Sequence, residues 1–403
     1  MASIASQATL RSSRSQPRRV EPPMSARFDL PLLLAVFALL GFGLTMVGSA
    51  SIAIADRELG QPFYYLIRQA IYVCIGVGIA SAVVWIPLYM WERFSALLLI
   101  TGMILLVVLL IPGISQSVNG STRWLSLGVI NLQPSEFMKL FVVVYLAGYL
   151  VRRGEEVRTR VWGFLKPMLV LMLIATLLLM EPDLGAAAVI FATALGMMFL
   201  GGVRLWQFAV LLMMVLSAVA ILTITSPYRL ERVTAFLNPW ADPFNSGFQL
   251  TQSLIAFGRG EWFGLGLGGS IQKLFYLPEA HTDFVFAILA EETGLFGSII
   301  VVALFTFIAW RAFKIANKAQ YLGLHFAAYV AFGITLWISM QAFINIGVNM
   351  GVLPTKGLTL PLMSYGGSSM LASCIAIALL VRVDIETRIA WLSFAGVKAG
   401  VKR

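Results

Sequence analysis

Residues 277–292 read Leu277-Pro-Glu-Ala-His-Thr-Asp-Phe-Val-Phe-Ala-Ile-Leu-Ala-Glu-Glu292 and lead into an apolar run that continues to about residue 310. About 20 consecutive apolar residues in a helix cross a hydrocarbon core about 30 Å thick, so this run predicts a transmembrane helix. Three ionisable side chains, Glu279, His281 and Asp283, stand at its mouth, although only 12% of the chain is charged. Because such groups are costly to keep there, we interpret them first as functional.

The rest of the chain is equally apolar. Hydrophobic residues make up 59% of its 403 residues, far more than in an ordinary soluble domain. The apolar runs are continuous rather than alternating, which predicts helices and not a barrel. The predicted fold class is an all-α polytopic membrane protein with about ten transmembrane helices. Their approximate ranges are 30–52, 65–86, 94–112, 136–151, 164–181, 184–202, 205–225, 283–310, 324–348 and 361–381. Between the fifth and sixth, Glu181-Pro-Asp-Leu-Gly185 favours a tight turn over one unbroken helix.

The positive charges orient this bundle. With ten spans both termini lie on one side, and that side holds 20 of the 29 Lys and Arg residues. The positive-inside rule therefore predicts that both termini are cytoplasmic. The net charge of +10 follows from this bias and indicates no nucleic-acid partner. We predict a disordered basic tail at 1–27, a ten-helix domain at 28–385 and a cytoplasmic tail at 386–403.

A large exoplasmic loop, about 226–282, is predicted between helices 7 and 8, and a loop of this length is usually functional or disordered. Within it, 249–257 has the apolar spacing of a helix lying along the membrane interface, with Trp240 and Trp262 as anchors. The run Gly264-Leu-Gly-Leu-Gly-Gly269 formally matches a nucleotide-binding motif. No strand–helix unit surrounds it, so we predict a tight turn that lets the backbone approach a neighbour closely.

Other polar groups fall on the same predicted side of the membrane. The segment 119–124 precedes 133–139, where Ser135 is a candidate helix N-cap and Glu136 and Lys139 are spaced to pair. Lys356 lies just outside the ninth span, and small polar residues interrupt the tenth at 364–369. Local ion pairing and close helix packing account for these features separately. Together they are able to place cations near one site that receives an anionic head group.

Five motifs, in this order, resemble one known family. They are Asn119–Trp124, Gln133–Lys139, Glu181–Gly185, Leu277–Glu292 and Gly347–Ser369. The sequence is similar to the SEDS proteins (shape, elongation, division, sporulation) over roughly residues 30–385. The runs 278–283 and 345–361 resemble the division form rather than the elongation form.

The resemblance implies a peptidoglycan glycosyltransferase that polymerises lipid II, a disaccharide-pentapeptide carried on a polyprenyl pyrophosphate. It implies a cognate class B penicillin-binding protein and bitopic division-complex activators as partners. It also implies a place in the bacterial cytoplasmic (inner) membrane at the division septum. Asp283 matches the essential aspartate of the family.

The chemistry assigns roles to individual side chains. A sugar hydroxyl is a poor nucleophile, so Asp283 is predicted to be its general base. A helix starting after Thr282 as N-cap would favour the ionised carboxylate and burial would oppose it, and the sequence leaves the outcome open. The candidate substrate-binding residues, including cations for the leaving pyrophosphate, are Arg123, Glu136, Lys139, Arg229, Gln252, Lys273, His281 and Lys356. Glu291 and Glu292 are predicted to pair with Arg or Lys.

Two questions stay open in the sequence. It contains no compact carboxylate cluster that predicts a metal site, and a divalent cation such as Mg²⁺ or Mn²⁺ held partly by the pyrophosphate remains open. A flippase for lipid II, a non-enzymatic scaffold and an elongation-type polymerase are the alternative functions. Against the flippase, no inverted repeat is evident and the polar groups gather at one membrane face.

Overall fold

The computed structural model describes residues 28–112, 115–118, 121–126, 131–225, 230, 234–245, 247–355 and 357–400. Several predicted features lie outside these residues. They are the N-terminal tail at 1–27, Asn119 in the first motif, and the candidate cations Arg229 and Lys356.

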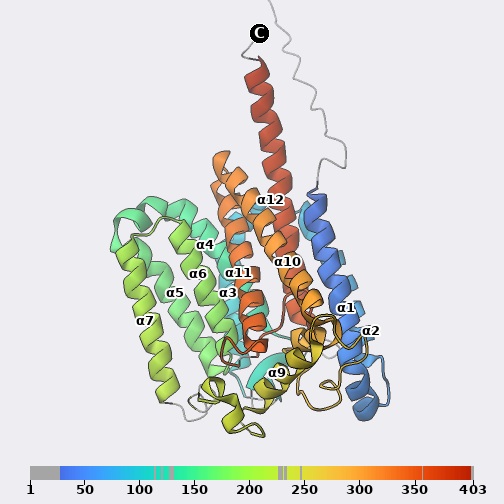
Figure 1. Ribbon diagram of the computed structural model, residues 1–403. Helices are drawn as coiled ribbons and strands as arrows, with labels where there is room; N and C mark the ends of the chain where they lie inside the picture. Colours follow the sequence, from blue (N-terminus) through green and yellow to red (C-terminus); the bar gives the residue numbers. More distant parts are fainter. Residues whose placement is uncertain are drawn as a thin grey trace, which may run out of the picture.

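A helix occupies each of the ten predicted spans (Figure 1). These helices are α1 (Leu30–Leu59), α2 (Tyr64–Trp85), α3 (Leu88–Leu109), α4 (Pro134–Thr159), α5 (Val161–Met180), α6 (Leu184–Leu200), α7 (Leu205–Ile224), α10 (Val285–Tyr321), α11 (His325–Asn349) and α12 (Gly367–Gly400). Within the described part of the chain, eight helices are long and apolar enough to cross a membrane, and α6 is a shorter apolar helix. The predicted polytopic membrane fold is confirmed.

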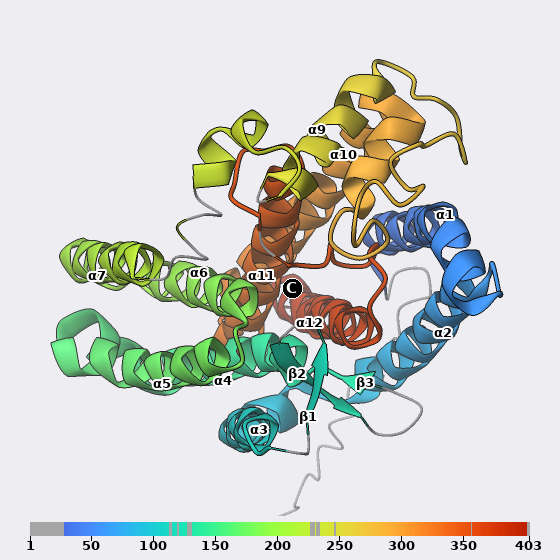
Figure 2. The same cartoon turned by 90° about the horizontal axis from the view of Figure 1, so that it is seen from below.

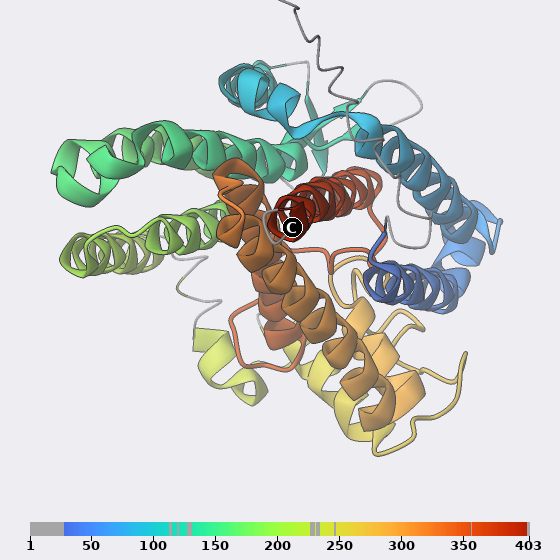
Figure 3. The same ribbon diagram turned by 90° about the horizontal axis from the view of Figure 1, so that it is seen from above.

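Three helices form the centre of the bundle. The most apolar stretches of α4 and α12 are each 78% buried and that of α11 is 72% buried, against 17% for α2. Figure 3 accordingly shows α12 in the middle of the ring of helices. Because lipid is as apolar as the core, the outer helices need no polar face. A polar side chain within these stretches of α4, α11 or α12 is therefore mostly surrounded by protein atoms rather than by lipid.

The two ends of the bundle differ. At one end lie the strands β1 (Ser115–Val118), β2 (Ser121–Ser126) and β3 (Asn131–Leu132), the short helix η2 (Pro239–Ala241), and α9 (Phe248–Gly260). The strands form an antiparallel sheet in the order β1-β2-β3. We call this the α9 end (Figure 2). The start of α1 and the end of α12 lie at the opposite, terminal end (Figure 1).

Several local predictions can be judged. A tight turn separates α5 from α6, and α9 covers the run predicted to be helical, so both predictions are confirmed. The helix N-caps were predicted wrongly. Phe284, not Thr282, precedes α10, because the Thr282 hydroxyl bonds Glu279 instead. Gln133, not Ser135, precedes α4, which begins with a proline.

Candidate functional site

Asp283 lies at the α9 end, where the loop after α9 meets α10, and its backbone is held by two amide side chains. The carbonyl oxygen of Asp283 accepts hydrogen bonds from Asn345 Nδ2 at 2.9 Å and Asn349 Nδ2 at 3.0 Å. Asn345 Nδ2 also donates to the Leu358 carbonyl, and Asn349 Oδ1 accepts from the Ala287 amide at 3.1 Å. The two asparagines thus fix the backbone of Asp283 without using its carboxylate.

The Asp283 carboxylate is half-buried, and no described residue donates a hydrogen bond to it. Burial raises its pKa to about 7, with the negative charges of Glu279, Asp183 and Glu136 acting in the same direction and Arg123 opposing them. Burial therefore prevails over any effect of the helix N-terminus, which answers the question the sequence leaves open. A carboxylate with a pKa near 7 is well suited to accept a proton at neutral pH.

A buried ion pair lies on α4. Lys139 Nζ, in a residue only 2% exposed, contacts both oxygens of Glu136 at 2.8 Å and donates to Gln341 Oε1 at 2.7 Å. The predicted pairing of Glu136 with Lys139 is confirmed. Gln341 Nε2 in turn donates to the Thr359 carbonyl at 2.9 Å, which ties α4 and α11 to the segment 357–366 beside Asp283.

Gln341, Asn345 and Asn349 form a polar ridge along α11, and none of them is more than 2% exposed. Residues four apart lie on one helix face, so the three side chains stack toward the α9 end. In the sequence Asn345 stands out only as part of a longer motif, and the ridge was not predicted. A spacing of four between amides in an apolar span was the signal that could have found it.

The turn between α5 and α6 supplies a second group of polar side chains. Asp183 caps α6, since its Oδ1 accepts from the Ala186 amide at 3.1 Å, and its Oδ2 accepts from the Ser135 hydroxyl at 2.9 Å. The Arg123 guanidinium, on β2, donates to the carbonyls of Glu181 and Pro182. Arg123 thereby stays near Asp183 and Asp283 with its charge unpaired among the described carboxylates.

The Glu181 side chain is fully buried, and neither of its carboxyl oxygens has a hydrogen-bond partner among the described residues. Burial raises the pKa of Glu181 to about 8, and the charge of Asp183 acts in the same direction. Glu181 is therefore mainly protonated at neutral pH, which keeps an uncompensated charge out of the turn.

An aromatic cluster lies beside the base. The His281 ring is 4.7 Å from that of Tyr65 and 5.5 Å from that of Tyr365, measured between centroids. The Tyr365 amide also donates to the His281 carbonyl at 3.0 Å. Burial lowers the pKa of His281, so its ring is neutral at pH 7. Arg68 lies over the Tyr64 ring at 5.0 Å and adds a cation that the sequence analysis did not single out.

The remaining predicted site residues are dispersed. Lys273 is buried against Glu292, with Nζ 2.7 Å from Oε1, so its charge is already neutralised. Gln252 is half-buried on α9. Among the described residues, no three His, Cys, Asp or Glu side chains come together as a metal site.

Comparison with known proteins identifies the family. The family model FTSW_RODA_SPOVE, described as cell cycle protein, matches residues 30–389. The chain belongs to this family. The SEDS resemblance of the sequence is thereby confirmed over nearly the whole chain.

Two relatives are similar along almost their full length. A protein of Thioalkalivibrio sulfidiphilus (strain HL-EbGR7), named probable peptidoglycan glycosyltransferase FtsW, is 58% identical over 94% of both chains. A protein of the same name from Nitrosococcus halophilus (strain Nc4) is 59% identical over 89% of this chain and 93% of that one. This identity confirms the predicted resemblance to the division branch.

Solved structures share the fold. One, titled "Structural coordination of polymerization and crosslinking by a peptidoglycan synthase complex", superposes with a TM-score of 0.73 at 29% identity, covering 89% of this chain and 98% of that chain. The rod shape determining protein RodA of Thermus thermophilus superposes with a TM-score of 0.65 at 26% identity, covering 89% and 96%. RodA is thus similar in fold and more distant in sequence than the FtsW relatives.

Proposed function

We propose that this protein polymerises lipid II into peptidoglycan glycan strands, with Asp283 as the general base. The observation that carries the proposal is a carboxylate whose backbone is clamped by Asn345 and Asn349, while its oxygens accept no hydrogen bond from the described residues. Its pKa of about 7 suits it to exchange a proton at physiological pH. The names of the relatives, probable peptidoglycan glycosyltransferase, support the same reaction.

In the proposed reaction Asp283 accepts the proton of the acceptor sugar's C4 hydroxyl as its oxygen attacks the anomeric carbon of the donor. The bond from that carbon to the lipid pyrophosphate breaks, and the pyrophosphate leaves with the bonding electrons. One base and a good leaving group suffice for such an inverting displacement, which agrees with a single base at Asp283 rather than a matched pair of carboxylates. Arg123 and Lys356 are the cations we propose for the leaving group, and a divalent ion such as Mg²⁺ or Mn²⁺ could share that role.

The same proposal sets the orientation in the membrane. We place the α9 end on the exoplasmic side, where lipid-linked sugars are joined, and both termini in the cytoplasm at the division septum. The excess of Lys and Arg toward the terminal end supports this orientation.

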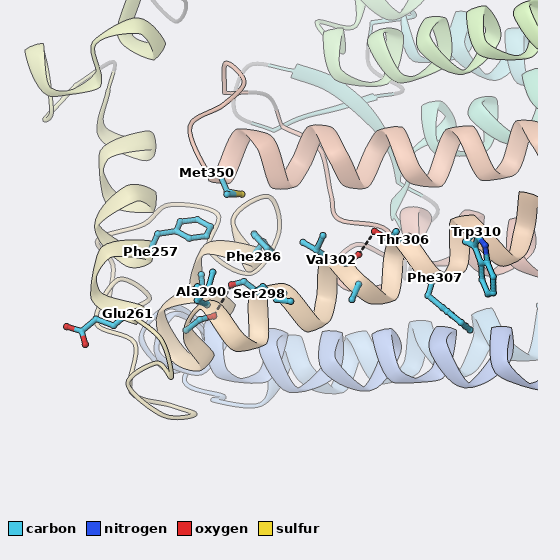
Figure 4. A pocket seen from close by; sticks show the side chains of 14 residues that line it. Phe257, Glu261, Phe286, Ala290, Ser298, Val302, Thr306, Phe307, Trp310 and Met350 are labelled. Carbon is cyan, nitrogen blue, oxygen red and sulfur yellow. Dashed lines mark hydrogen bonds between the residues drawn. The ribbon is translucent and has the colours of Figure 1, made fainter.

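A groove along α10 suits the transmembrane helix of a cognate class B penicillin-binding protein (Figure 4). The groove has a volume of about 910 Å³ and runs from Phe286 to Trp310, with Phe257 of α9 and Met350 at one end. The unbroken part of this stretch, from Leu295 to Trp310, measures about 23 Å at 1.5 Å per residue, which is most of the thickness of a membrane core. Its hydroxyls already bond their own helix, so an apolar helix meets no unsatisfied donor there. We propose this partner, together with bitopic activators of division.

The test compares wild type with Asp283→Asn in polymerisation of purified lipid II. Each is assayed in complex with the penicillin-binding protein, whose transpeptidase is inactivated so that uncrosslinked strands can be resolved on a gel. We expect the variant to lose at least about a hundredfold in rate, the usual contribution of a general base. Thermal unfolding and co-purification of the partner are expected to match wild type.

Other outcomes are equally informative. Equal strand formation by both proteins would place the base elsewhere. If neither makes strands although both bind lipid II and an activator is present, movement of labelled lipid II between leaflets would favour a flippase.

A further inference from the structure

The helix that follows Asp283 is broken. Gly294 has φ 66° and ψ −162°, which divides α10 into a short segment, 285–293, and a long segment, 295–321. Only glycine adopts such a conformation readily. The short segment begins two residues after Asp283, so its orientation relative to the long one sets the position of Asp283 in the bundle.

The backbone of the loop after α9 fills this break. The amides of Leu265 and Gly266 donate to the carbonyls of Glu291 and Glu292, both at 3.0 Å, before the break. Beyond it, the Leu295 amide donates to the Glu261 carbonyl at 2.9 Å. The glycine-rich run thus approaches a neighbouring backbone closely, as the sequence predicts.

The backbone contact leaves no room for a side chain. A Cβ atom on Gly264, which has φ +78°, would lie 2.2 Å from the Glu292 carbonyl oxygen. One on Gly294 would lie 2.5 Å from the Gly264 nitrogen. The loop and the broken helix therefore pack as one unit at this point.

The Glu291 side chain links the broken part of α10 to the loop after α9 and to α9 itself. Its carboxylate is fully buried and accepts hydrogen bonds from the Ser270 hydroxyl and from the amides of Ile271 and Gln272, both at 3.2 Å. Arg259, in the last turn of α9, completes the shell with its Nε 3.2 Å from Oε1. One carboxylate thus gathers four donors from two separate segments.

The Glu292 side chain links the same part of α10 to α1. Its Oε1 accepts from Lys273 Nζ at 2.7 Å and from the Ser49 hydroxyl at 2.6 Å, and Lys273 also donates to Ser49 at 2.8 Å. The Glu292 side chain is fully buried and that of Lys273 is 9% exposed. The pairing of both acids with Arg and Lys was predicted from sequence and is confirmed.

We propose that Glu291 and Glu292 are positioning residues for the polymerisation reaction. With Arg259 and Lys273 they hold the short segment at a fixed angle and thereby hold Asp283 against its substrate. This inference rests on the proposed role of Asp283 as the base. In this proposal the loop between α9 and α10 positions Asp283 in addition to contacting a partner. Lys273 belongs to this positioning group and does not bind the pyrophosphate.

Two features favour positioning over simple packing. Backbone hydrogen bonds from Leu265, Gly266 and Leu295 already close the break at Gly294, so the two carboxylates are not needed for that purpose, and burying them is expensive unless their charges are paired. Both acids also lie within three residues of Gly294, where a restraint controls the angle between the two segments most strongly. A displacement of the base by about 1 Å is sufficient to cost on the order of a hundredfold in rate.

The test uses Glu292→Gln, which keeps the size of the side chain and weakens its bonds to Lys273 and Ser49. We expect kcat for lipid II polymerisation to fall at least about tenfold while KM stays within about twofold, because the substrate contacts are intact. Hydrogen exchange at the Leu265 and Gly266 amides is expected to become faster. Lys273→Arg, which keeps the charge, is expected to retain more activity than Lys273→Met.

Glu156→Gln is the matched control. Glu156 also pairs with two cations, Lys166 at 2.6 Å and Arg153 at 3.1 Å, but it lies at the terminal end. The Glu156→Gln variant is expected to leave both kcat and hydrogen exchange at the amides of residues 265 and 266 unchanged.

Unchanged kcat in Glu292→Gln, in a wild-type background that polymerises, would overturn the positioning role and leave the proposed function standing. So would an equal loss in Lys273→Arg and Lys273→Met. Absence of polymerisation by wild type would instead count against the proposed function itself.

Discussion

Asp283 lies just before one short helical segment and Glu292 near the end of it, yet the surroundings of their carboxylates are opposite. Glu292 is fully buried and accepts a lysine and a hydroxyl, and its neighbour Glu291 accepts four donors. The Asp283 carboxylate is half-buried and accepts nothing from the described residues. Only its backbone is held, by Asn345 and Asn349.

This difference indicates two roles: Glu291 and Glu292 hold the backbone in place, and Asp283 takes part in the reaction. The carboxylates of Glu291 and Glu292 are engaged by donors, whereas that of Asp283 has no donor among the described residues and a pKa raised to about 7. Glu291 and Glu292 fix the backbone through their partners, whereas the half-buried Asp283 is left for the substrate. The comparison predicts that removing a partner from a paired acid harms the fold, whereas changing the surroundings of Asp283 harms the chemistry.

The largest effect is expected from Lys139→Met. This variant leaves the Glu136 carboxylate buried without its cation, which typically costs about 3–5 kcal/mol. We expect a markedly lower unfolding temperature in detergent or nanodiscs, measured by intrinsic fluorescence.

The double variant Glu136→Gln/Lys139→Met is the control, because it removes both charges. It is expected to recover a large part of the lost stability. If the single and double variants unfold at the same temperature, Glu136 and Lys139 are not coupled and do not belong with the paired acids.

The same residues show which parts of the fold and the site can be predicted from the sequence. Apolar runs predict the ten helices because a lipid environment imposes length and composition on any span. The pairing of Glu136 with Lys139 follows from a local spacing on one helix. The clamp on Asp283 brings together residues more than 60 positions apart, and local spacing does not show such contacts. The spacing of Gln341, Asn345 and Asn349 in the sequence predicts a polar face on α11. It does not predict that this face contacts the backbone of Asp283.

The pKa of Asp283 shows a second limit. Helix polarity and burial act in opposite directions, and their balance depends on how the loop and the segment 357–366 cover the carboxylate. The charge of Glu279 in the same loop and those of Asp183 and Glu136 in two other segments add to it. The sequence therefore predicts the residue but not its state of protonation.

An intermediate effect is expected on the pH profile of polymerisation. Asp283 must be ionised to act as a base, and burial raises its pKa to about 7. The rate at limiting lipid II is therefore expected to fall about tenfold per pH unit below pH 7 and to level off above it. Initial rates between pH 5.5 and 8.5 measure this limb.

Glu279→Gln sharpens the same experiment. The negative charge of Glu279 helps to raise the pKa of Asp283, so its removal is expected to move the acid limb to lower pH. The variant should then be less inhibited than wild type at pH 6. An acid limb that does not move would show that another group controls it.

The smallest effect is expected from Gly357→Ala, which changes the surroundings of Asp283 by one methyl group. A Cβ atom on Gly357 would lie 3.1 Å from Asp283 Oδ2, so the carboxylate or the loop must move by a few tenths of an ångström. The methyl group also removes water from the carboxylate, which raises its pKa further. We expect a fall in kcat of about three- to tenfold with little change in unfolding temperature.

Gly78→Ala is the matched control for Gly357→Ala, since nothing lies within 4 Å of a Cβ atom at Gly78 on α2. It is expected to leave kcat unchanged and to stabilise the helix slightly, because alanine favours helix over glycine by about 1 kcal/mol. Equal activity of the two variants would show that a methyl group at Gly357 does not disturb Asp283 when the substrate is bound. The space beside the carboxylate would then differ from that in the structure. A loss confined to Gly357→Ala would show that the open side of the carboxylate is the side on which the reaction takes place.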